Sequence, residues 1–143
     1  YVYTRRLPRN YACYVDILRN PKMLYTKNVN LTTTDVTEIL EIPQGYIGHW
    51  NMLFISNLHN STNDISIFID KDPDPDAYIF LEKSVGSKDY LFFPPSGNGV
   101  IVIPPGETIK ANAGSVGNIE VIVTLDLVYA PFTFNGMNHS NAT

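Results

Sequence analysis

The sequence predicts an all-β protein, an antiparallel β-sandwich of jelly-roll type with an extended N-terminal arm. Three observations lead to this fold class. Between residues 34 and 130, β-branched and aromatic residues alternate with polar residues in short runs, as in half-buried strands. Each run ends at Gly, Pro, Asn or Asp, which favour turns. Helical periodicity is nearly absent, so the crossover helices of βαβ folds are not expected.

The strands are expected one after another, each ended by its own turn. The first ends at Pro43-Gln44-Gly45, where Pro presets φ and Gly supplies a positive φ. A polar loop over residues 57–64 separates the next two, and Pro104-Pro105-Gly106-Glu107 forms a tight turn later in the chain. The expected strands are 34–42, 46–57, 65–69, 78–83, 90–93, 99–103, 108–112 and 119–129.

The last of these strands has the clearest period of two. Its alternate positions, which include Glu120, Thr124 and Asp126, face outward because successive side chains of a strand point to opposite sides. The apolar positions predicted to face the core are Ile119, Val121, Val123, Leu125 and Leu127. We therefore expect one face of the sheet to be buried and the other to be mostly in solvent.

Length and composition exclude several classes of protein. With 143 residues, 44% hydrophobic and 17% charged, the chain has the size and composition of one folded domain. No run approaches the roughly 18 apolar residues of a membrane-spanning helix, so a membrane partner is not expected. The net charge of −4 argues against nucleic acid as a partner. The single Cys13 excludes an internal disulfide and is interpreted as a packed hydrophobic residue.

The charge distribution divides the chain. Six of the ten basic residues lie in residues 1–33, which we interpret as an N-terminal arm or edge strand. Residues 34–130 form the sandwich, and residues 131–143 a flexible C-terminal tail. The basic, aromatic arm could dock on acidic surfaces of neighbouring copies, whereas an equal alternative makes residues 11–18 another strand of the sandwich. The predicted interface residues are Tyr1, Tyr3, Arg5, Arg6, Arg9, Tyr11 and Tyr14.

Alternating aspartates in the segment 70–76 are the closest approach to a metal site. Begun at Asp70, a calcium-binding EF-hand loop would need Gly where Pro75 stands and Glu where Leu81 stands. A solvated loop is therefore preferred over a loose surface cation site. The histidines are too scattered in sequence for zinc, and we expect no metal and no cofactor; they are His49, His59 and His139.

Motifs for catalysis are missing. The sequence contains no nucleophile elbow, phosphate-binding loop or dinucleotide fingerprint, so the protein is not expected to be an enzyme, and a small hydrolase ranks last among the hypotheses. Four asparagines fit the N-glycosylation pattern and are interpreted as loop formers; they are Asn30, Asn60, Asn138 and Asn141.

From residue 38 to 127 the order of elements resembles that of small β-sandwich virion proteins of tailed bacteriophages, including head decoration (cement) proteins and tail or fibre accessory domains. The segments that carry this resemblance are 39–45, 50–57 with 61–69, and 102–109 followed by 119–125. The resemblance implies a homo-oligomer located in the virion that binds the major capsid or tail protein, with function residing in its contacts.

Two functional hypotheses follow from different classes. The first is a bacteriophage structural protein that decorates or reinforces the capsid or tail. The alternative is a carbohydrate- or receptor-binding β-sandwich module, suggested by nine Tyr and by Trp50, because aromatic faces pack on sugar rings. A host glycan would then be the partner.

Overall fold

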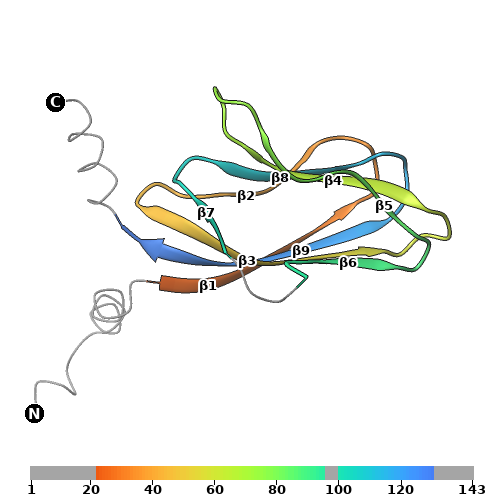
Figure 1. The fold of residues 1–143 in the computed structure, drawn as a ribbon, viewed down its shortest axis with the longest axis horizontal. Coiled ribbons are helices and arrows are strands. Elements are labelled where there is room, and N and C mark those ends of the chain that lie inside the picture. The colour runs from red at the N-terminus through yellow and green to blue at the C-terminus, as the bar shows by residue number, and fades with distance from the viewer. Residues whose placement is uncertain (1–21, 96–99, 131–143) are drawn as a thin grey trace, which may run out of the picture.

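The computed structural model describes residues 22–95 and 100–130, which form two antiparallel sheets packed face to face (Figure 1). Sheet A has the order β1 (Lys22–Leu31), β9 (Ile119–Tyr129), β3 (Tyr46–Asn57) and β6 (Tyr90–Phe93), and β7 (Ile101–Ile103) also pairs with β3. Sheet B has the order β2 (Thr37–Glu41), β8 (Thr108–Ala113), β4 (Asn63–Asp70) and β5 (Ala77–Val85). The predicted all-β antiparallel sandwich is confirmed.

The strand boundaries follow the sequence pattern closely. Strands β3, β6 and β9 begin and end at the expected residues, whereas β2 begins only at Thr37 and β7 only at Ile101. β1 lies inside the range 1–33 and forms an edge of sheet A. The predicted interface residues Tyr1 to Tyr14 and the tail 131–143 lie outside the described residues. None of the described residues belongs to a helix able to span a membrane.

The core lies between the two sheets. All five inward positions predicted for β9 are buried, as are Ile65, Ile67 and Ile69 of β4. Burial of such side chains contributes about 1.5–3 kcal/mol each before the entropy cost of ordering them. Trp50, only 2% exposed, donates a hydrogen bond from its indole Nε1 to the carbonyl oxygen of Met52 at 3.0 Å. The ring is therefore buried without leaving its donor unpaired.

Two predicted turns meet at one end of the sandwich. Gly45 and Gly106 both have φ of 86°, the left-handed conformation that favours glycine. The amide of Ile42 donates to the carbonyl of Glu107 at 3.0 Å, and the amide of Gly106 donates to the carbonyl of Ile42 at 2.8 Å. These hydrogen bonds hold the two turns together and so fix the entry of the chain into β3 and β8.

Candidate interaction surface

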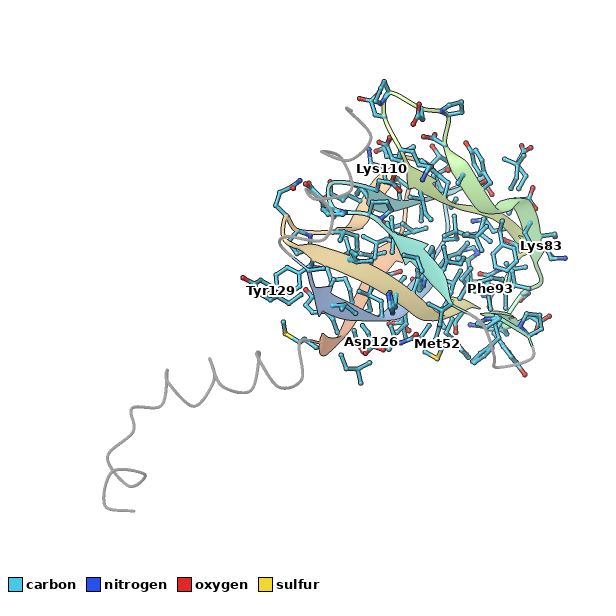
Figure 2. All side chains as sticks on the ribbon, turned by 60° about the vertical axis from the view of Figure 1, so that its left-hand side comes forward. Met52, Lys83, Phe93, Lys110, Asp126 and Tyr129 are labelled. Carbon is cyan, nitrogen blue, oxygen red and sulfur yellow. The ribbon has the colours of Figure 1, made fainter. Side chains whose placement is uncertain are left out.

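The outer face of sheet A carries a row of apolar side chains that crosses three strands. In the register of the sheet, Ile122 of β9 lies opposite Phe54 of β3, and Phe54 lies opposite Phe92 of β6. These positions alternate with buried residues, so their side chains point away from the core. Next to Phe54 along the same face, Met52 is half-buried. Figure 2 shows Met52 on the side of sheet A, away from Lys110 on the opposite sheet.

On this face the ring of Phe54 contacts those of Tyr90 and Phe92, and we name these three residues the aromatic cluster. The rings of Phe54 and Tyr90 are nearly parallel, at 4°, with centroids 5.5 Å apart. Phe92 meets Phe54 edge-on at 5.9 Å and 88°. Tyr90 is 59% exposed and Phe92 41% exposed. A preassembled aromatic cluster that remains in solvent is typical of a protein-binding surface.

A polar row borders the aromatic cluster at the next register position. Asn30, Glu120 and Ser56 lie side by side across β1, β9 and β3, and Ser56 lies opposite Tyr90. The row provides amide, carboxylate and hydroxyl groups at the edge of an apolar area. This arrangement of an apolar centre and a polar rim matches the anatomy of protein interfaces.

Asn57, at the end of β3, positions β6 and with it two members of the cluster. This side chain is 1% exposed, and its Nδ2 donates to the carbonyl oxygens of Ser61 at 2.9 Å, Val85 at 3.0 Å and Gly86 at 3.2 Å. Its backbone amide donates to the carbonyl of Asp89 at 2.9 Å. Because these bonds hold the turn before β6, they determine where Tyr90 stands.

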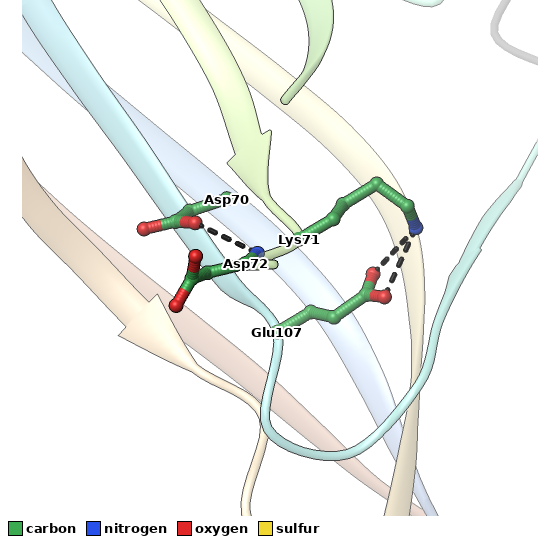
Figure 3. A network of polar contacts seen from close by, with 4 residues as sticks. All are labelled: Asp70, Lys71, Asp72 and Glu107. Carbon is green, nitrogen blue, oxygen red and sulfur yellow. Dashed lines mark hydrogen bonds and ion pairs between the residues drawn. The ribbon is translucent and has the colours of Figure 1, made fainter. Parts of the chain in front are cut away.

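The outer face of sheet B is charged instead. Lys110 of β8 forms an ion pair with Asp70 of β4 at 2.6 Å. In the loops that follow β4 and precede β8, Lys71 pairs with Glu107 at 2.8 Å (Figure 3). The hydrogen bond from Lys110, followed by the one from the backbone amide of Asp72, lowers the pKa of Asp70. The same pairing with Asp70 raises the pKa of Lys110. Asp70 and Glu107 therefore already have lysine partners.

The aspartates of the 70–76 segment do not converge. Within residues 22–95 and 100–130, no group of three or more His, Cys, Asp or Glu side chains is arranged to hold a metal ion. His49 is half-buried on the outer face of sheet A, while its neighbour Trp50 is buried, as alternation predicts for adjacent residues of a strand.

Sequence reasoning missed the aromatic cluster. The signal in β6 was present, because Tyr90 and Phe92 share one face of a short strand whose other face holds Leu91 and Phe93. In β3 the signal was misleading, because a register shift against β9 between Trp50 and Met52 changes which residues face outward. Counting in twos from the buried Trp50 would place Phe54 inside.

Comparisons with known proteins bear on the fold. No protein-family model matches the sequence, and no curated protein matches it. Among solved structures, the chain is similar to one described as "Acidic stable capsid structure of Helicobacter pylori bacteriophage KHP30", with a TM-score of 0.51 and 10% sequence identity. The match covers 76% of this chain and 93% of that chain. At this identity the similarity establishes a shared β-sandwich fold over nearly the whole of the other chain.

Proposed function

We propose that this protein is a structural component of a bacteriophage virion that binds other virion subunits through the outer face of sheet A. The observation that carries the proposal is the fold, which matches 93% of a chain from a phage capsid structure. The resemblance of the strand order to phage decoration and tail accessory proteins supports the same role. Decoration or reinforcement of the capsid or tail is the specific role proposed.

The pairing of the strands supports the jelly-roll topology within this proposal. β4 pairs with β5, β3 with β6 and β7, β2 with β8, and β1 with β9. Along the chain, each pair of strands encloses the next, and β4 with β5 is the innermost pair. This is the pairing of one long hairpin that folds over to form two sheets. Jelly rolls of this kind occur in viral capsid domains, so the topology agrees with the proposed role.

The aromatic cluster is the proposed contact. Aromatic side chains dominate the binding energy of protein interfaces because they bury a large apolar area with few rotatable bonds. The chain is accordingly proposed to act through its contacts, without enzymatic activity, as one of several copies in the virion.

A second candidate function is supported by the polar row beside the cluster. Aromatic rings next to Asn30, Glu120 and Ser56 offer both a surface for the C–H face of a sugar and hydrogen-bonding groups for its hydroxyls. It ranks second because Phe54 and Tyr90 are stacked, so each ring covers part of the other. Binding of the full chain on a glycan array that is lost on Tyr90→Ser would favour this function.

Two measurements test the proposed function. Washed virions should contain the protein in a fixed ratio to the major capsid protein, and its absence would reject the proposal. In reconstitution onto particles that lack the protein, the double variant Tyr90→Ser/Phe92→Ser should bind at least about ten-fold more weakly, since loss of a hot spot costs about 2 kcal/mol or more. Leu81→Ser, which removes a 62% exposed apolar side chain from sheet B, is the matched control and should bind normally.

A further inference from the structure

β1 presents a long, uninterrupted edge. It pairs with β9 over its whole length of ten residues, from Lys22 opposite Val128 to Leu31 opposite Ile119, with no register shift. It is the terminal strand of sheet A, so within the described residues no strand pairs with its other side. No proline or bulge interrupts the edge. An edge of this kind is a template for a further strand.

The inner face of β1 is also incompletely covered. Met23 and Lys27 lie opposite Leu127 and Val123, both buried, and so point toward the inner side of sheet A. Met23 is nevertheless 50% exposed and Lys27 is exposed, whereas Tyr25 and Val29 are partly buried against the core. The free backbone edge and these inner positions together form a ledge, defined here as the free edge of β1 with Met23, Tyr25, Lys27 and Val29.

Residues 11–18, which precede β1, have the pattern that fits this ledge. Their odd positions are all apolar or aromatic, and among their even positions, which also include Ala12, Tyr14 and Leu18, only Asp16 is charged. A strand that keeps Asp16 in solvent therefore turns the odd positions toward the ledge. These positions are Tyr11, Cys13, Val15 and Ile17. Extended, the segment spans about 26 Å, which β1 can accommodate.

The short connection to β1 opposes a return of this segment to its own edge. Only Arg19, Asn20 and Pro21 lie between the segment and Lys22. Two- and three-residue hairpin loops need positive φ at one or both loop residues, whereas Pro21 is restricted to a φ of about −65°. The residue before a proline is driven to extended conformations, so Asn20 also resists a tight turn. The sequence of this connection therefore disfavours a hairpin return to the β1 of the same copy.

Charge favours a partner with the same sequence. Residues 1–21 contain four arginines and one aspartate, a net charge of +3, and residues 22–143 contain six lysines and thirteen carboxylates, a net charge of −7. The N-terminal segment of one copy is therefore attracted to the body of another.

We propose that residues 11–18 of one copy add as a strand to the free edge of β1 in a second copy, with Cys13, Val15 and Ile17 packed on its ledge. This inference rests on the proposed function in one respect, because both require several copies of the chain to come together. Each copy then both donates and accepts a strand, which produces either a closed ring or a reciprocal dimer. The partner is a second copy of this chain, recognised through backbone hydrogen bonds and alternate apolar side chains.

Cross-linking of the full chain tests this inference, because Cys13 is its only cysteine. In the variant Lys27→Cys, mild oxidation should yield covalent dimers, since the inner positions of two adjacent strands come within disulfide distance. The variants Met23→Cys and Tyr25→Cys test which inner position of β1 lies closest to Cys13 of the added strand. Asn28→Cys, with the opposite facing, and the unmodified chain are the matched controls and should give several-fold less dimer.

The alternatives produce different results. An intrachain disulfide, seen as loss of both thiols in a monomer, would show that the segment returns to its own edge and would overturn the inference. Dimer yields equal to those of Asn28→Cys would also overturn it. Val15→Asp should abolish association in light scattering, whereas Ala12→Asp should preserve it. Because these experiments use the purified chain in solution, their failure is distinct from absence of the protein from virions.

Discussion

The two outer faces of the sandwich both hold aromatic rings in contact, but they leave different numbers of these rings exposed. On sheet B, Phe68 is only 6% exposed and lies beneath Tyr78, with ring centroids 5.1 Å apart. On sheet A, Phe92 is 41% exposed and Tyr90 59% exposed. Sheet B also carries the ion pair between Lys110 and Asp70. Sheet B therefore covers Phe68 while its partner Tyr78 stays 48% exposed, whereas sheet A leaves both Tyr90 and Phe92 open to another surface.

The two aromatic groups should differ most in how much they contribute to the free energy of unfolding. Phe68→Ala should lower the free energy of unfolding by about 3 kcal/mol, because it removes a buried ring and leaves a cavity. Phe92→Ala should lower it by less than about 1 kcal/mol, as for most exposed positions. Urea denaturation of both variants measures the difference. Equal losses of unfolding free energy in the two variants would mean that the aromatic cluster of sheet A stabilises the fold, so the two faces would not differ in this respect.

An intermediate effect is expected at Asn57, which supports sheet A from within. Asn57→Ala leaves the carbonyls of Ser61, Val85 and Gly86 without this donor and should cost about 2–3 kcal/mol, since buried unsatisfied polar groups are expensive. Asn51→Ala, which removes one half-buried hydrogen bond to Asp126 at 3.2 Å, is the control and should cost about 1 kcal/mol or less. Thermal denaturation compares the two. If Asn57 acts as described, its variant also binds particles more weakly.

The smallest expected effect concerns the charged face of sheet B and depends on pH. Because folding lowers the pKa of Asp70 below 3.8, the pair with Lys110 stabilises the fold fully above that pH and loses its contribution as the pH falls through the lowered value. Because folding raises the pKa of Lys110 above 10.5, the contribution is also lost as the pH rises past the raised value. Asp70→Asn should therefore reduce the melting temperature slightly at neutral pH and not in strong acid.

A change in salt concentration provides a second test of this ion pair. The side chains of Asp70 and Lys110 are each 27% exposed, so added salt should shrink the difference between the two proteins at neutral pH. If the melting temperatures of the two proteins still differ in acid, the substitution acts through lost packing and not through loss of the ion pair. Such a result would mean that Asp70 stabilises sheet B through packing, as Phe68 does.

Local patterns in the sequence were sufficient for much of the fold. The period of two in β9 predicts its buried residues, and Pro-Gly signals predict the turns at Gly45 and Gly106, because both features depend on neighbours in the chain. The same reasoning could not locate the aromatic cluster, since its members come from β3 and β6 and meet only through strand pairing. The predicted interface residues between Tyr1 and Tyr14 stay a prediction.

The order of residues along the chain was enough to predict that it forms strands, where most of the turns lie, and which face of β9 is buried. The face of β3 that holds Phe54, in contrast, depends on how β3 pairs with β9. The register shift between Trp50 and Met52 reverses the facing of the residues that follow, so Leu53 and Ile55 enter the core and Phe54 emerges beside Phe92. The physical reason is that a bulge is a property of two paired strands, and no local propensity in β3 records how β9 will meet it.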